Sequence, residues 1–264
     1  NIFGDYFCVF TLDMGIRGAG IATAMGAGIS TLVMLTHFFK KSNTLRLQFS
    51  KEIFRLFGRI TVNGFSSFII DVAMGVLTML FNRQIMKYLG TDALAVYGVI
   101  VSVSTLVQCC SYGIGQASQP IISQNYGAGN VDRIKKMLRY NIITAAIFGA
   151  VWAAITFAVP NGLIRLFMTP TASVLAIAPA IIRIYGSSFL LLPFNVYSTY
   201  YFQATMRAKT SMFVSVARGI LISGALILII PVTLGADMIW WAMPVTELVV
   251  AVFAGAMMAK KIQL

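Results

Sequence analysis

The sequence predicts an all-α fold, a polytopic helical bundle embedded in a membrane. Hydrophobic residues occupy 58% of the 264 positions and charged residues only 11%, a balance far from that of globular domains. Mean hydropathy is +0.84. Apolar windows of the roughly 20 residues that a helix needs to cross a bilayer recur along the chain. These three observations indicate an integral membrane protein whose environment is the lipid bilayer.

The apolar windows predict seven complete transmembrane helices. The first twelve residues are also apolar, but as a helix they would span only about 18 Å of a ~30 Å hydrocarbon core. We therefore expect them to be the end of a helix that begins upstream, in a longer transporter chain. The complete windows are residues 16–39, 60–81, 94–122, 141–160, 175–201, 212–234 and 238–258.

The basic residues predict the orientation of these helices. Of the 20 Lys and Arg residues, 14 fall in every second loop or at the C-terminus, and four fall in the other loops. Cationic loops stay on the cytoplasmic side of a membrane. We therefore expect a multi-pass protein of the inner (plasma) membrane with a cytoplasmic C-terminus, and no nucleic-acid partner despite the net charge of +12.

An internal repeat predicts the domain organisation. An offset of 220 residues aligns residues 13–41 with residues 233–261 without a gap, and Gly15 then meets Gly235. Secondary transporters are built from such repeats around a site near the midplane. The chain then comprises the end of one lobe (1–39), a cytoplasmic amphipathic linker (40–59) and a lobe of six transmembrane helices (60–264).

Two acidic residues, Asp71 and Glu247, fall near the middle of predicted membrane helices. Burying an ionisable side chain there costs at least about 2.5 kcal/mol, so each requires an explanation. A carboxylate at that depth can exchange a proton or hold Na⁺, and both residues are candidates for coupling an ion gradient to transport. Asp71 is also the candidate Na⁺ ligand. For Glu247 the alternative is that it serves backbone groups freed by Pro244.

Polar side chains form stripes on several of the predicted helices, each within an arc of roughly 100–120°. Such a stripe faces protein or water. Its residues either line a substrate cavity or join helices by hydrogen bonds worth about 0.6–2 kcal/mol each. Arg183 is in addition a candidate partner for Asp71, and Pro120 is expected to bend its helix at the cavity. The candidates for cavity lining are Asn63, Ser67, Thr78, Asn82, Gln108, Tyr112, Gln116, Gln119, Arg183, Asn195, Thr199 and Gln203.

Five stretches carry a resemblance to a known family. They read SSFIIDVAMGVLTMLFN, YLGTDALAVYGVI, YGIGQASQPIISQNYGAGNVDRIKKMLRY, YYFQATMRAKTS and ARGILISGALILIIPVTLGADMIWWAMPVTE. In this order they resemble the multidrug and toxic compound extrusion (MATE) family, in particular its bacterial DinF-like branch. The opening NIFGDYFCVFTLDMGIRGAGIATA is similar to the end of that family's first lobe.

The resemblance implies a two-lobe antiporter of twelve helices, of which this chain supplies part of helix 5, helix 6 and the lobe of helices 7 to 12. It implies export of drug-like, often cationic, organic compounds in exchange for H⁺ or Na⁺, by alternating access of the two lobes. The N-terminal lobe of the same chain would be the missing partner. Asp71 matches the acidic residue of the seventh helix in sodium-coupled members, where Glu is usual. No acid matches their Asp on the tenth helix, so the coupling ion stays open.

Two other functions fit the sequence less well. A flippase for lipid-linked sugars or polysaccharide precursors, from the same superfamily, would carry a more cationic cavity for pyrophosphate. An intramembrane enzyme is the remote alternative, because His37 is the only histidine and no HExxH motif accompanies it. We therefore expect a transporter rather than an enzyme, with no cofactor.

Overall fold

The computed structural model describes residues 2–39 and 53–259, and every regular element in these two ranges is helical. The prediction of an all-α fold is confirmed. The chain divides into two compact units, Asn1–Phe54 and Arg55–Leu264.

The first unit is a hairpin of two helical segments. The chain reverses at Asp13 and Gly15, which both adopt the left-handed backbone region with φ of 50° and 53°. The segments then pack closely, because a Cβ added to Gly18 would lie 2.7 Å from the carbonyl oxygen of Cys8. The elements are α1 (Ile2–Tyr6), a π-helical turn η1 (Phe7–Thr11), α2 (Gly15–Leu35) and a 3-10 turn η2 (Thr36–Phe39).

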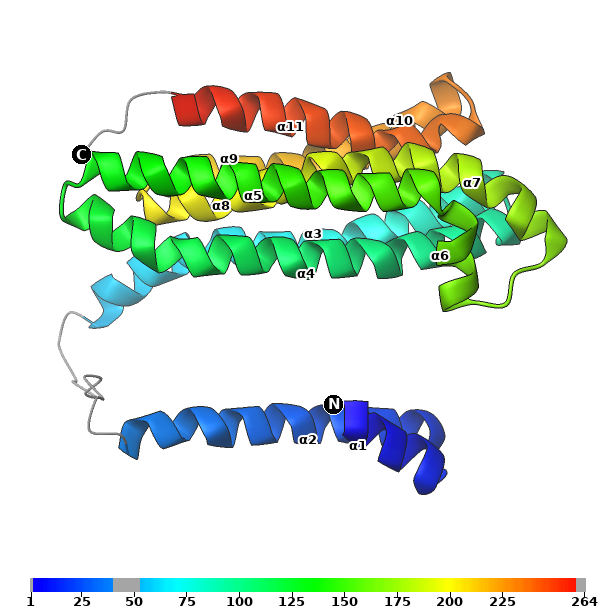
Figure 1. The fold of residues 1–264 in the computed structure, drawn as a ribbon, viewed down its shortest axis with the longest axis horizontal. Helices are drawn as coiled ribbons and strands as arrows, with labels where there is room; N and C mark the ends of the chain where they lie inside the picture. The colour runs from blue at the N-terminus through cyan, green and yellow to red at the C-terminus, as the bar shows by residue number, and fades with distance from the viewer. Residues whose placement is uncertain (1, 40–52, 260–264) are drawn as a thin grey trace. The chain divides into compact units, whose positions relative to one another are not determined.

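The second unit is a bundle of long helices, several of which change direction or helical type part-way (Figure 1). Short 3-10 or π-helical turns join consecutive α-helical segments into longer rods. The segments are α3 (Ile53–Tyr88), α4 (Thr91–Gly127), α5 (Val131–Ala158), α6 (Pro160–Phe167), α7 (Ala172–Gly186), η3 (Ser187–Leu190), α8 (Leu192–Ala204), α9 (Ala208–Val216), η4 (Ala217–Leu221), α10 (Ile222–Thr233), η5 (Ala236–Trp241) and α11 (Ala242–Ala259).

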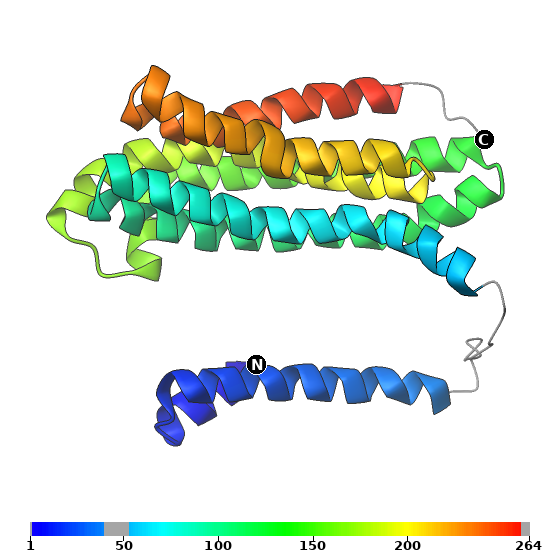
Figure 2. The same cartoon turned by 180° about the vertical axis from the view of Figure 1, so that it is seen from behind.

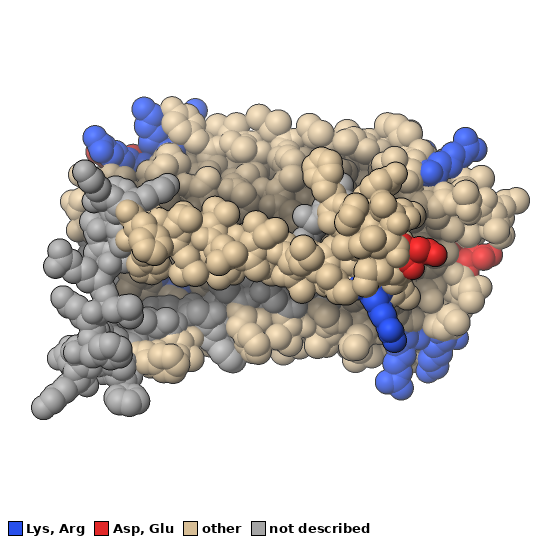
Figure 3. Space-filling view, turned by 90° about the horizontal axis from the view of Figure 1, so that it is seen from below, with Lys and Arg blue, Asp and Glu red and all other residues tan. Residues whose placement is uncertain are grey.

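Six helices within the described residues are long and apolar enough to cross a membrane. They correspond to six of the seven predicted spans, and the chain is a multi-pass membrane protein. The remaining predicted span, residues 60–81, lies within α3, where many side chains fall outside the described part. In Figure 3 the charged side chains lie near the ends of the helices, and the surface along the helices is uncharged.

Several predicted boundaries were too narrow. The span predicted for residues 141–160 is an α-helix that begins at Val131. Its first turns carry exposed basic side chains, which hydropathy alone places in a loop although they continue the helix into the polar boundary of the membrane. The span predicted for residues 175–201 likewise runs from Ala172 to Ala204 through the 3-10 turn η3.

The centre of the bundle is α4, which packs along α8, α5 and α7. The segments of α4 and α8 approach closely at Gly115, where an added Cβ would lie 2.2 Å from the ring of Tyr200. Small residues at such crossings let membrane helices come together. Pro120 lies inside α4, and the C-terminal turns of α4 are inclined to the rest of the helix (Figures 1 and 2).

Glycines also fix the position of α5 against the α7–η3–α8 rod. A Cβ added to Gly149 would lie 2.5 Å from the carbonyl oxygen of Leu190. On the neighbouring turns, a Cβ added to Gly186 would lie 2.4 Å from the hydroxyl of Thr156. The first of these contacts is with backbone, which cannot rotate away.

We therefore expect Gly149→Ala to destabilise the folded protein by about 1–3 kcal/mol, the usual cost of overpacking. The Tm of the purified full-length protein in detergent measures this. Gly98→Ala on α4 is the matched control, because an added Cβ there meets nothing within 4 Å. A Tm for Gly149→Ala equal to that of Gly98→Ala would contradict the close contact.

Candidate functional site

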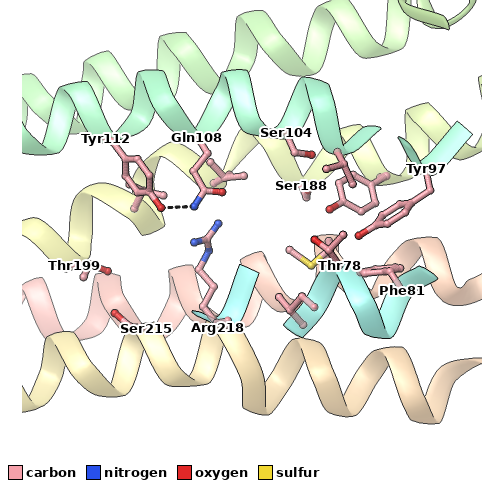
Figure 4. Close-up of a pocket in the computed structure, with 18 of the residues that line it drawn as sticks. Thr78, Phe81, Tyr97, Ser104, Gln108, Tyr112, Ser188, Thr199, Ser215 and Arg218 are labelled. Carbon is pink, nitrogen blue, oxygen red and sulfur yellow. Dashed lines mark hydrogen bonds between the residues drawn. The ribbon is translucent and has the colours of Figure 1, made fainter. Parts of the chain in front are cut away.

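A cavity of about 80 Å³ lies inside the second unit, at mid-length of the bundle. Side chains from α3, α4, α7, η3, α8, α9, η4 and α11 line it (Figure 4). Aromatic and aliphatic surface alternates with hydroxyl and amide groups. Its polar and aromatic lining residues are Thr78, Phe81, Tyr97, Ser104, Gln108, Tyr112, Tyr185, Ser188, Thr199, Tyr200, Ser215 and Arg218.

Arg218 is the one charged side chain among the cavity-lining residues that the structure describes. Its Nε donates to Oε1 of Glu247 at 2.8 Å. Asn195 donates from its Nδ2 to Oε2 of the same carboxylate at 2.6 Å and to the backbone carbonyl of Glu247 at 2.8 Å. Both carboxylate oxygens are therefore occupied, and three helices of the bundle meet at one polar group.

The two side chains of this ion pair differ in how deeply they are buried. The side chain of Glu247 is 0% exposed, whereas that of Arg218 is 14% exposed. Glu247 does not line the cavity, so the carboxylate lies behind the guanidinium. The cavity thus meets the cationic partner of a pair whose negative partner is enclosed by protein.

The backbone around Arg218 explains its position. Arg218 lies in the π-helical turn η4, a local widening that often marks functional sites. Ser223 donates its hydroxyl to the carbonyl oxygen of Arg218 at 2.7 Å, which helps to hold this turn. The next residue, Gly219, allows α3 to approach, since a Cβ there would lie 2.6 Å from the Cβ of Ala73.

Opposite Arg218, α4 presents a joined pair of polar side chains. Gln108 is 5% exposed and donates from Nε2 to the hydroxyl of Tyr112 at 2.6 Å. The ring of Tyr112 in turn packs edge-on against Tyr200 of α8, with centroids 6.3 Å apart. Figure 4 shows the guanidinium of Arg218 directed across the cavity toward this pair.

The structure brings together four of the predicted cavity residues, because Thr78, Gln108, Tyr112 and Thr199 all line the cavity. Glu247 lies behind it and accepts hydrogen bonds from both Asn195 and Arg218. The stripe of α4 therefore faces the lobe interior over several turns.

Three of the predicted glutamines lie farther along the α4–α8 contact. Gln116 donates to the hydroxyl of Tyr200, and Gln119 donates to Oε1 of Gln203, each at 3.4 Å. These bonds join the two helices. They correspond to the helix-joining alternative that the sequence left open for such residues.

Arg183 and Asn82 lie away from the cavity. Arg183 is exposed near the C-terminal end of α7, where its Nε donates to the carbonyl oxygen of Phe157 at 3.1 Å. Asn82 is exposed on α3. Asp71 lies in α3, but its side chain, like those of Asn63 and Ser67, falls outside the described residues.

Sequence reasoning missed Arg218 as the partner of Glu247, and a depth calculation could have found it. Arg218 lies ten residues from the start of α9, and Glu247 lies twelve residues from the end of α11, about 15 and 18 Å along their helices. Both ends face the same side of the bundle. Two opposite charges at similar depth on adjacent helices are candidates for a pair.

The described residues contain no group of three or more His, Cys, Asp or Glu that could hold a metal ion. The cavity instead offers hydroxyl and amide groups, aromatic rings and one guanidinium. This combination can hold an organic molecule that has apolar surface and a polar end.

Comparisons with known proteins extend over nearly the whole chain. The MatE family model matches residues 65–229. The multidrug export protein MepA of Staphylococcus saprophyticus is 24% identical and that of Staphylococcus haemolyticus 25% identical, each over 96% of this chain and 56% of the relative. The chain spans about half the length of the curated relatives it matches.

Solved structures share the fold. An outward-facing multidrug resistance MATE transporter of the MOP superfamily superposes with a TM-score of 0.86 at 21% identity, over 97% of this chain and 58% of that one. A MOP superfamily transporter from Pyrococcus furiosus, whose binding pocket is described as reversed in polarity, gives a TM-score of 0.85 at 20% identity with the same coverage.

Proposed function

The chain belongs to the MatE family of multidrug efflux transporters, and we propose that the full-length protein exports drug-like organic compounds in exchange for H⁺ or Na⁺. Proteins of this family are transporters rather than enzymes. The observation that carries the proposal is the cavity inside the second unit, where aromatic rings, hydroxyl groups and the guanidinium of Arg218 meet at mid-length of the bundle. Residues 60–264 would form one of two lobes that alternate access to the two sides of the membrane.

The size and lining of the cavity favour, as substrates, compounds that are apolar over most of their surface. Drug-sized sites measure about 300–1,000 Å³, so a cavity of about 80 Å³ would hold one end of such a compound. Aromatic rings adapt to varied apolar shapes and can also contact organic cations. The relatives named MepA are multidrug exporters, and we extend that activity to this protein as part of the proposal.

A flippase for lipid-linked precursors is less well supported. A pyrophosphate carries several negative charges and is usually held by a cluster of Arg and Lys side chains. Within the described residues the cavity has one cation, and Glu247 already neutralises it. The lining therefore favours drug-like compounds.

We assign coupling to Asp71 rather than to Glu247. Both oxygens of Glu247 accept hydrogen bonds from Arg218 and Asn195, so taking up a proton or Na⁺ would require breaking that pair. Asp71 lies in α3, seven residues before the cavity-lining Thr78. Seven residues are about two helical turns, so both positions lie on one side of the helix.

The bias of Lys and Arg toward every second loop supports a cytoplasmic C-terminus, with the inner membrane as the location. Under this orientation, the basic first turns of α5 lie at the cytoplasmic side. The widely spaced cations of the other loops, such as Arg165 in α6, lie at the outer side.

Reconstitution of the full-length protein into liposomes tests the proposed function. We expect ethidium, an aromatic cation, to move faster when a Na⁺ or a pH gradient is imposed than when an ionophore has collapsed that gradient. The gradient that accelerates movement identifies the coupling ion. Movement at the rate of protein-free liposomes under both gradients would refute the proposed function.

A further inference from the structure

The guanidinium of Arg218 has more hydrogen-bond donors than the protein uses. An arginine side chain carries five N–H groups in a planar fork. One of them, on Nε, bonds to Glu247. The four N–H groups on the two terminal nitrogens make no hydrogen bond to any residue that the structure describes, and Figure 4 shows this end of the side chain inside the cavity.

The ion pair holds Arg218 in position but leaves the two terminal nitrogens of its guanidinium without a hydrogen bond to the described residues. Glu247 and Asn195 hold the Nε edge of the guanidinium from behind, and the π-helical turn η4 fixes the backbone. The side chain is 14% exposed, so its terminal nitrogens can be reached from the cavity. The open edge of the fork is therefore available to a ligand in the cavity.

We propose that Arg218 binds the carboxylate of an organic substrate through its two terminal nitrogens. The planar fork of a guanidinium matches the two oxygens of a carboxylate. This inference rests on the proposed function and names a class of compound within it, namely amphipathic aromatic compounds that bear a carboxylate. Zwitterions belong to this class, and simple organic cations do not.

The other residues that line the cavity suit a ligand in which a carboxylate is attached to an apolar body. Ser188, whose hydroxyl has no partner among the described residues, is 2% exposed and lines the same cavity. The rings of Tyr112 and Tyr200 provide apolar surface beside the polar groups. A volume of about 80 Å³ suits a carboxylate and part of a ring rather than a whole drug.

Arg218 could instead serve only to neutralise Glu247. Both roles predict that removing Arg218 alone disturbs folding, because an unpaired carboxylate would remain buried. A test must therefore remove both charges together. The double variant Arg218→Gln/Glu247→Gln leaves no unpaired charge and keeps an acceptor for Asn195.

Two dyes with the same xanthene body test the proposal. Rhodamine 110 carries a free carboxylate, and rhodamine 123 is its methyl ester. We expect the purified full-length transporter to bind rhodamine 110 about tenfold more tightly than rhodamine 123, as measured by fluorescence anisotropy, since a charge-assisted hydrogen bond is worth about a tenfold change or more. In the double variant the two affinities should become equal.

Arg165→Gln is the matched control, because it removes an exposed cation of α6 and should leave the ratio of the two affinities unchanged. Equal affinities in the wild type, no binding of rhodamine 110, or a preference that survives in the double variant would each overturn the proposal. The preference is measured without an ion gradient. If the preference for rhodamine 110 is absent, gradient-driven transport of ethidium is still expected, and only the role of Arg218 is refuted. If the transport of ethidium fails, the proposed function itself is refuted.

Discussion

Arg218→Gln should be among the most destabilising single substitutions in the second unit. The substitution leaves the carboxylate of Glu247, which is 0% exposed, without its charge partner. Breaking a buried ion pair from one side costs about 3–5 kcal/mol, because the remaining charge stays buried without compensation. The Tm of the full-length protein in detergent should therefore fall well below that of Arg165→Gln, a surface substitution that is expected to change stability by less than about 0.5 kcal/mol.

The two remaining variants distinguish the contribution of the ion pair to stability from the contribution of the individual side chains. Glu247→Gln should cost less than Arg218→Gln, because the arginine it leaves behind faces the cavity, where water can reach it. The double variant should recover most of the loss, since replacing a buried pair by neutral groups is often neutral in stability. A double variant as unstable as Arg218→Gln would show that the side chain of Arg218, rather than its charge, stabilises the bundle.

This pair also shows why the fold was more predictable than the site. Apolar windows and loop charges are local properties, and each predicted span corresponds to a helix in the structure. Contacts between helices depend instead on how each helix is rotated about its axis. Arg218 and Glu247 are 29 residues apart on different helices, and only the packing of α9, η4 and α11 brings them together.

The polar stripes illustrate an intermediate case. The helical repeat groups Gln108, Tyr112, Gln116 and Gln119 on one face of α4. It does not reveal where along that face the cavity ends and the contact with α8 begins. The position of Gly115 marks the contact, because its missing side chain lets Tyr200 of α8 approach α4.

Arg183 shows the limit of reasoning from charge alone. Its place in an apolar segment makes it a candidate partner for an intramembrane acid. In the structure it lies on the last turns of α7, exposed, where it satisfies the carbonyl oxygen of Phe157 at the end of α5. The capping of a neighbouring helix has no signature in the sequence of α7 itself.

Asp71→Asn should abolish the response of transport to an ion gradient while leaving dye binding in place. The substitution keeps the size of the side chain and removes the negative charge that would attract H⁺ or Na⁺. Because the cavity is built from other residues, the variant should still bind rhodamine 110 with the affinity of the wild type. Gradient-driven ethidium movement in liposomes should fall to the rate measured after an ionophore has collapsed the gradient.

A control variant and a conservative variant test whether the loss of the gradient response is specific to the carboxylate of Asp71. Asp237→Asn removes an exposed acid from η5 and should leave gradient-driven movement unchanged. Asp71→Glu keeps the carboxylate, and Glu is the usual residue at this position in the sodium-coupled proteins that the sequence resembles, so it should retain coupling. If Asp71→Asn responds to the gradient as the wild type does, the coupling site lies elsewhere, and Glu247 becomes the acid to test next. Its pairing with Arg218 would then have to open during each transport cycle, which predicts that the preference for rhodamine 110 depends on the same gradient.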